Sequence, residues 1–269
     1  MAQKEDALDL LQAARCEDLL YEQIKALTVV GDFEKDLISK LKQSGAHLLQ
    51  GARGVGKSML LRSAEIDLDS SFATDKKLAV YINFKTSTLL EGVRAGERDG
   101  FQLWVNAKIL QALHEKLVLL DLIGKGGQED PYFHVFGIRS VENTKTYLQD
   151  KIHLLQRLAF VQEKDAVVKE IGSDFLDKII DTGFLVDILK DLVADFDLQK
   201  IIFLFDEAAH TFIPAQQEIF FEIFKLIHGG HIACKAAVYP TVTSYGKNFE
   251  VGQDAFVLAI DRFDLRGPR

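Results

Sequence analysis

Short apolar runs and amphipathic stripes alternate along most of the chain. The apolar runs have the length and composition of buried strands, and they predict strands over 46–50, 78–84, 201–205, 235–239 and 255–260. Between them, apolar side chains recur at three- and four-residue spacing, which predicts helices over 6–26, 32–42, 58–65, 101–120, 144–161, 184–196 and 216–228. Because strands that alternate with helices form parallel sheets covered on both faces, we predict a three-layer αβα fold of the α/β class.

The interval from 86 to 198 is long for a connection between two strands. Its apolar stripes predict a helix over 101–120, a loop over 124–131 that is rich in glycine, and then two or three more helices. Such stripes are packing surfaces, so we assign them no chemistry. The interval is predicted to be a large helical insertion between the second strand and the third.

Residues 51–58 read Gly-Ala-Arg-Gly-Val-Gly-Lys-Ser, which is the G-x-x-x-x-G-K-[ST] pattern of a phosphate-binding P-loop. The pattern follows a predicted strand and precedes a predicted helix, the order that it requires. Glycines let backbone N–H groups curl around phosphate oxygens, Lys57 reaches the β- and γ-phosphates, and Ser58 ligates Mg²⁺. The predicted nucleotide-binding residues here are Gly51, Arg53, Gly54, Val55, Gly56, Lys57, Ser58 and Met59. The alternative is a glycine-rich turn that binds nothing.

The apolar run 201–205 ends in two carboxylates, Asp206 and Glu207, which is the Walker B pattern. A continuous apolar run is typical of a central parallel strand, and ligands bind at the carboxyl ends of such strands. We therefore expect Asp206 to hold the Mg²⁺ together with Ser58, and Glu207 to orient and polarise the attacking water. The alternative is that Asp206 caps a helix and Glu207 is a solvated side chain.

Composition limits the class of protein. The chain has 269 residues, of which 48% are hydrophobic and 27% charged, as in an ordinary globular protein. No apolar run approaches the roughly 18 residues of a membrane helix, and the N-terminus is too charged for a signal peptide, so we expect a cytoplasmic protein. The net charge of −8 disfavours direct binding to nucleic acid. The two cysteines, Cys16 and Cys234, are predicted to be buried thiols.

With these motifs in place, the chain resembles the AAA+ superfamily of P-loop ATPases, and within it the origin-recognition-like and STAND-type ATPases. Residues 29–34, Val-Val-Gly-Asp-Phe-Glu, resemble the segment that lines the adenine in that family, which implies a contact from Val30; Asp32 stands where the family has arginine. Thr241 and Thr243 fall at the sensor-1 position, which contacts the γ-phosphate or the attacking water. Tyr245 stands where the Thr-Ser-Arg motif of STAND proteins has arginine.

The resemblance implies a single AAA+-like domain over 1–269. Its parts are the N-terminal helices with the adenine-side segment (1–45), the P-loop unit (46–85), the helical insertion (86–198) and the Walker B and sensor-1 region (199–269). The helical lid of the family would follow the last strand, where no room remains for it. We expect either that the chain is a fragment of a longer protein or that the lid is absent. The arginine-finger position is also unfilled, and Arg262, Arg266 and Arg269 are ordinary surface residues or candidates for that role.

Three other polar positions each have a functional and a structural interpretation. Asn83, at the carboxyl end of the second strand, either binds water in the site or caps the strand. His210 either senses the nucleotide or lies on the surface. The sequence from His228 to Cys234 resembles half a zinc site, but structural zinc takes about four ligands and no companion pair stands nearby, so we reject zinc there.

The sequence therefore predicts an ATP- and Mg²⁺-dependent hydrolase that switches conformation or assembly with its nucleotide. It would act as a homo-oligomer or with a protein partner. Two alternatives stay open, a nucleotide-gated scaffold with negligible hydrolysis and a DNA-loading ATPase, although the acidic net charge weakens the second.

Overall fold

The computed structural model of the chain describes residue 19 and residues 21–27, 31–85, 90–124, 127–208 and 212–260. Its centre is a parallel sheet of five strands, β1 (His47–Gln50), β2 (Lys77–Asn83), β5 (Lys200–Asp206), β6 (Ile232–Val238) and β7 (Phe256–Ala259). Their order in the sheet is β2-β5-β6-β1-β7, and every neighbouring pair is parallel. The predicted α/β class with a parallel sheet is thus confirmed.

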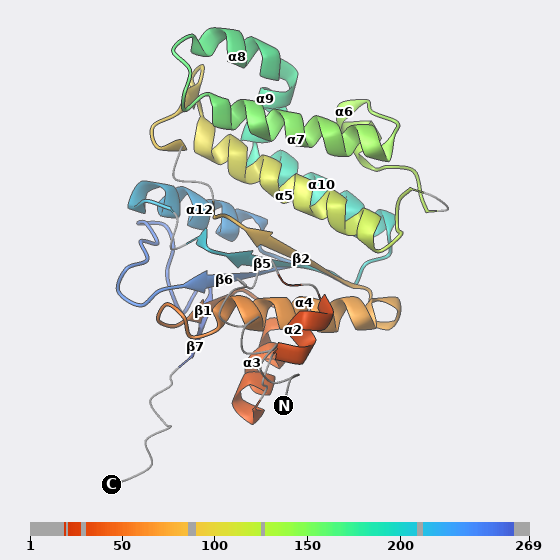
Figure 1. Cartoon of the computed structure of the whole chain (residues 1–269), viewed down its shortest axis with the longest axis vertical. Helices are drawn as coiled ribbons and strands as arrows, with labels where there is room; N and C mark the ends of the chain where they lie inside the picture. Colours follow the sequence, from red (N-terminus) through yellow and green to blue (C-terminus); the bar gives the residue numbers. More distant parts are fainter. Residues whose placement is uncertain are drawn as a thin grey trace, which may run out of the picture.

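Helices cover both faces of the sheet, as Figure 1 shows. Because side chains alternate along a strand, Leu49 and Leu204 pack with α3 (Asp32–Leu41) and α4 (Lys57–Asp75). Leu48 and Phe203 belong to the larger core on the opposite face, which contains α5 (Gly100–Leu119) and α12 (Pro214–Ile227). A short helix, α2 (Tyr21–Leu27), lies against α4. The central strands can be apolar throughout because both of their faces are buried.

Beyond α5, the insertion continues with helices on the side away from the sheet, whereas its last helix packs against α12 (Figure 1). After α5 come α6 (Tyr132–Phe136), α7 (Val141–Arg157), α8 (Lys164–Ile171), α9 (Ser173–Ile180) and α10 (Thr182–Asp195). The prediction of two or three helices here was too low, because α6, α8 and α9 have only five to eight residues and show too few turns of an apolar stripe. The sequence pattern also did not predict a short antiparallel hairpin of two-residue strands, β3 (Arg94–Ala95) and β4 (Arg98–Asp99).

Helix starts were predicted late where a polar cap precedes the stripe. The Ser140 side chain accepts a hydrogen bond from the Asn143 backbone, and α7 therefore begins three residues before the predicted start. In the same way the Asp181 carboxylate accepts from the Gly183 N–H at the start of α10. Strand β6 also begins three residues early and ends at Val238, so Tyr239 lies just beyond its end.

Lys235 is a fully buried lysine in the middle of β6. Its ammonium donates to the Gln43 carbonyl at 2.8 Å and to the Gly45 carbonyl at 2.7 Å, and it lies 2.7 Å from His47 Nδ1. Burial lowers the pKa of Lys235 to about 7, and burial with the Lys235 charge lowers that of His47 to about 4. The lysine thus ties the loop after α3 to two neighbouring strands of the sheet.

Replacing Lys235 by methionine is expected to lower the free energy of unfolding by about 2–4 kcal/mol. Methionine fills a similar volume, but it leaves two partly buried carbonyls and a partly buried ring nitrogen without their donor. Urea unfolding measures the effect. Lys190→Met is the control, because this lysine is exposed in an ion pair with Asp187 and its loss should cost less than about 0.5 kcal/mol. Equal stability of the two variants would contradict the structural role of Lys235.

Candidate functional site

The loop 51–56 joins the carboxyl end of β1 to the first turn of α4, as the motif predicted. Gly54 and Gly56 have φ angles of 80° and 93°, in the left-handed region that favours glycine. An added Cβ at either position would meet no atom within 4 Å, so the backbone conformation is what these two sites demand. Gly51 differs, because its Cβ would lie 2.8 Å from Val55 Cγ2. The loop therefore turns the chain sharply at the N-terminus of a 19-residue helix.

Lys57, the first residue of α4, points back over this loop and is only 6% exposed. Its ammonium donates to the carbonyls of Gly51 at 2.7 Å and Ala52 at 2.8 Å. It also lies 3.9 Å from the centre of the Tyr239 ring. Burial lowers the pKa of Lys57 to about 8, against the opposing charges of Asp206 and Glu207. The charges of Asp206 and Glu207, the Walker B carboxylates, thus act on the lysine of the P-loop pattern.

Asp206 ends β5 and is 2% exposed. Its two oxygens accept hydrogen bonds from the Tyr81 hydroxyl at 2.7 Å and from the Glu207 backbone at 2.9 Å. Tyr81 reaches it from β2, the neighbouring strand, where Asn83 pairs with Asp206 in register. The aspartate is therefore held by two donors at the carboxyl edge of the sheet.

A group of charged side chains lies behind Tyr81. The Arg62 guanidinium stands 4.8 Å from the centre of the Tyr81 ring and is paired with Glu65 of its own helix. Lys116 of α5 pairs with the same glutamate at 2.5 Å and with Asp69 at 2.8 Å. These contacts connect α4 to α5 beside the edge strand β2 and hold Arg62 against the residue that orients Asp206.

Backbone strain marks two of the predicted catalytic residues. Among the described non-glycine residues, five have a positive φ, and three of these, Lys76, Asp121 and Asp197, stand at or just after the C-terminal end of a helix, where that conformation is common. The other two are Glu207 at 61° and Thr241 at 62°. A left-handed conformation that does not follow the end of a helix costs a residue with a Cβ about 1 kcal/mol or more and is concentrated at functional sites.

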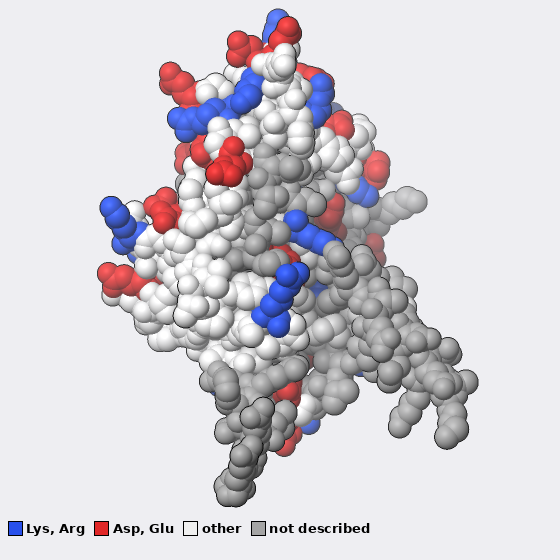
Figure 2. All heavy atoms as spheres, turned by 60° about the vertical axis from the view of Figure 1, so that its left-hand side comes forward, with Lys and Arg blue, Asp and Glu red and all other residues white. Residues whose placement is uncertain are grey.

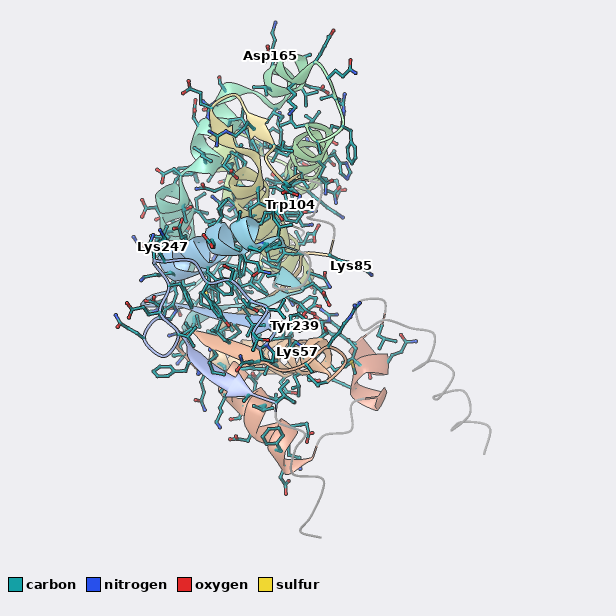
Figure 3. All side chains as sticks on the ribbon, turned by 90° about the vertical axis from the view of Figure 1, so that its left-hand side faces the viewer. Lys57, Lys85, Trp104, Asp165, Tyr239 and Lys247 are labelled. Atoms are coloured by element: carbon teal, nitrogen blue, oxygen red, sulfur yellow. The ribbon has the colours of Figure 1, made fainter. Side chains whose placement is uncertain are left out.

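Tyr239, like Tyr81, is a site residue that the sequence motifs do not predict. Figure 3 shows it beside Lys57 on the side of the molecule where the strands end. Burial, together with the charges of Glu207 and Asp206, raises the pKa of Tyr239 to about 12, while Arg53 opposes the shift. Its sequence signal is its position at the end of the predicted strand 235–239. The structure shows that this strand, β6, pairs with both β1 and β5.

The sensor-1 candidates occupy different surroundings. The Thr243 hydroxyl donates to the Tyr239 carbonyl at 2.9 Å and accepts from the Tyr239 N–H at 3.0 Å, so it fixes the backbone of that tyrosine. Thr241 is exposed and bonds to the Pro240 carbonyl at 2.7 Å. Tyr245 packs in an aromatic cluster, with its ring 4.7 Å from that of Phe221.

Other predicted residues fall around this centre or outside the described part. Arg53 and Gly54 are exposed, and Val55, Ser58 and Met59 are half-buried beside Lys57. Asn83 caps its strand, since its side-chain oxygen accepts from the Lys85 N–H at 2.9 Å. Cys234 is a buried thiol, as predicted. The positions that lie outside the described residues are Cys16, Val30, His210, Arg262, Arg266 and Arg269.

Charged side chains of both signs lie on the face of the molecule that Figure 2 shows. Figure 2 shows acidic and basic side chains together at the top of the molecule, and a middle region with few charged side chains. Within the described ranges, no helix is long and apolar enough to cross a membrane, and no group of three or more His, Cys, Asp and Glu side chains is placed to hold a metal ion. Comparison of the chain with models of known families, with curated proteins and with solved structures finds no match.

Proposed function

We propose that this chain binds ATP with Mg²⁺ at the loop 51–58 and hydrolyses it, as a P-loop switch of the AAA+ type. One observation carries the proposal. The lysine of the P-loop pattern and the two carboxylates of the Walker B pattern stand 149 and 150 residues apart in sequence (206 − 57 and 207 − 57), yet the two patterns lie at the same edge of the sheet, at the carboxyl ends of β1 and β5, which flank β6. A chance match of either pattern gives no reason for the two to meet.

The phosphates would be bound by the backbone of the loop and by the ammonium of Lys57. The N-terminus of α4 lies directly after the loop, and its partial positive charge adds to that of the lysine. Arg53 is exposed on the same loop, where its guanidinium is accessible to the nucleotide. These groups favour a ligand with several negative charges in a row, which is the chemistry of a nucleoside triphosphate.

The donor set suits Mg²⁺ held jointly with phosphate. Mg²⁺ in nucleotide sites takes one or two protein oxygens and fills its octahedron with phosphates and water. Ser58 at the start of α4 and Asp206 at the end of β5 provide a hydroxyl and a carboxylate. Both Asp206 oxygens already accept one hydrogen bond, and each keeps a further lone pair for a cation. When bound, the ion would neutralise charge on the phosphates.

Glu207 would orient the attacking water and accept its proton. The backbone of Glu207 is left-handed, and its charge acts on the pKa values of both Tyr239 and Lys57. Thr241 is accessible at the same edge and Thr243 fixes its neighbour Tyr239, so we assign the sensor role to this turn as a whole. Catalysis of this kind rests on placement and charge.

A neighbouring copy or a partner protein would supply any further cation to the transferred phosphate, as an arginine finger does. Turnover that rises with protein concentration or with a partner supports the switch. Binding without turnover under both conditions supports the nucleotide-gated scaffold.

The test is the affinity for ATP with and without Mg²⁺, measured by titration of a fluorescent ATP analogue. We expect wild-type protein to bind more tightly with Mg²⁺, and Asp206→Asn to lose most of that difference while it keeps the Mg²⁺-independent part. Asp187→Asn is the control, because this exposed carboxylate lies on α10 in the helical insertion. Lack of ATP binding by the folded wild-type chain would refute the proposal.

A further inference from the structure

Tyr239 is fixed against the P-loop through its backbone. Its N–H and carbonyl both bond to the Thr243 hydroxyl, at 3.0 and 2.9 Å. The residue before it, Val238, accepts a hydrogen bond from the Gly51 N–H at 3.3 Å, which joins the end of β6 to the first glycine of the loop. These contacts hold the backbone of Tyr239 beside the loop, and the centre of its ring lies 3.9 Å from the Lys57 ammonium.

The Lys57 ammonium is fully engaged in this state. It donates to two carbonyls of the loop, those of Gly51 and Ala52, and the Tyr239 ring lies against it. All three groups belong to the protein itself, and the lysine is almost completely shielded from solvent. A phosphate oxygen that binds this ammonium must draw it away from these groups.

The ring favours the ammonium over a phosphate. The face of an aromatic ring carries the negative part of its quadrupole, so it attracts a cation and does not attract an anion. The phenol is also neutral near pH 7, since the ordinary pKa of tyrosine is about 10 and burial with the nearby carboxylates raises it further, to about 12. Contact with the Tyr239 face therefore stabilises the ligand-free position of Lys57 and contributes nothing comparable to a bound phosphate.

We propose that Tyr239 is a positioning residue for Lys57, which it holds against the P-loop carbonyls, and that a nucleotide binds only by displacing the ammonium from the ring. This inference rests on the proposed function, since it concerns the same lysine. Its consequence is that the wild-type ring lowers the affinity for ATP, because part of the binding free energy is used to break the contact between lysine and ring.

Removal of the ring tests the inference directly. Tyr239→Leu is expected to tighten ATP binding by about 5- to 30-fold, since a shielded cation–π contact contributes on the order of 1–2 kcal/mol. Tyr239→Phe keeps the ring and is the conservative rescue, with an affinity that returns to within about twofold of wild type. Equal or weaker binding by the folded leucine variant would overturn the inference, because the ring would then assist the nucleotide at least as much as it assists the free lysine.

A series of fluorinated rings at position 239 separates the electrostatic effect of the ring from effects of side-chain shape or folding. Phenylalanine at position 239 with one, two or three ring fluorines keeps nearly the same volume while the quadrupole weakens stepwise. We expect the dissociation constant for ATP to fall with each added fluorine. Affinities that do not follow the fluorine number would refute the role of the ring face.

A third measurement needs no nucleotide and so separates this inference from the proposed function. The acylation rate of Lys57 by an amine-reactive reagent, followed by peptide mass spectrometry, is expected to rise severalfold in Tyr239→Leu and to stay near the wild-type rate in Tyr239→Phe. Lys247, an exposed lysine on the same side of the molecule, gives the internal reference rate (Figure 3). Faster acylation together with a failure of every variant to bind ATP would refute the function and leave the positioning role intact; an unchanged rate would overturn the positioning role itself.

Discussion

Lys57→Ala is expected to weaken ATP binding by about 100-fold or more while the fold stays intact. The ammonium would form charge-assisted hydrogen bonds to two phosphates, and each such bond contributes about 1.5–3 kcal/mol. The loss to the folded state is smaller, because in the ligand-free protein the lysine bonds only to two carbonyls of its own loop and to one ring. Titration with a fluorescent ATP analogue measures the affinity, and thermal unfolding checks the fold.

Lys247→Ala removes the same charge from an exposed position on the same side of the molecule, and its affinity should stay within about twofold of wild type. A folded Lys57→Ala protein with the affinity of this control would refute the assignment of the P-loop.

The contact between Lys57 and a bound phosphate also predicts how the affinity for ATP depends on pH. Burial lowers the pKa of Lys57 to about 8 in the free protein, and a bound phosphate would raise it again by its negative charge. Between those two pKa values binding takes up a proton, so the affinity is full below pH 8 and falls as the pH rises through it. We expect binding at pH 9.5 to be about 20-fold weaker than at pH 7.5, and this slope to vanish in Lys57→Ala.

The sequence predicts the layers of this fold because its central strands are continuous runs of apolar residues. The run 201–205 is buried on both sides, and so it has no polar alternation that would make it ambiguous. The outer insertion is harder, since α6, α8 and α9 have only one or two turns and their ends depend on caps and on packing against α5 and α7. Tertiary contacts, more than periodicity, determine these short helices.

The site, too, contains residues that the sequence predicts and residues that only the folded structure brings in. The P-loop pattern locates Lys57 because phosphate binding demands a fixed spacing of glycine and lysine, which is visible in one segment. Tyr81 and Tyr239 have no such local signal. They belong to the site only because β2 and β6 end beside β5, and the strand order β2-β5-β6-β1-β7 is a property of the folded sheet. A resemblance to known ATPases pointed to the threonines of the turn, whereas the side chain in contact with the lysine is the tyrosine just before them.

Glu207 provides the sharpest test of hydrolysis, because its effects on stability and on activity should have opposite signs. Its φ of 61° is unfavourable for any residue with a Cβ, whereas glycine adopts it at little cost. Part of the folding free energy is therefore used to keep a carboxylate at this point of the chain. Strained backbone conformations of this kind are concentrated at functional sites.

We expect Glu207→Gln to bind ATP about as tightly as wild type and to hydrolyse it about 100-fold more slowly or worse, because the amide fills the same space but cannot accept the proton of water. Glu207→Gly should hydrolyse equally slowly and yet be more stable by about 1 kcal/mol, since it relieves the strain. Single-turnover hydrolysis with protein in excess isolates the chemical step from product release, and urea unfolding gives the stability. Wild-type turnover in both variants, when the wild-type rate exceeds that of Lys57→Ala, would show that another group activates the water and would leave the strained backbone without a catalytic explanation.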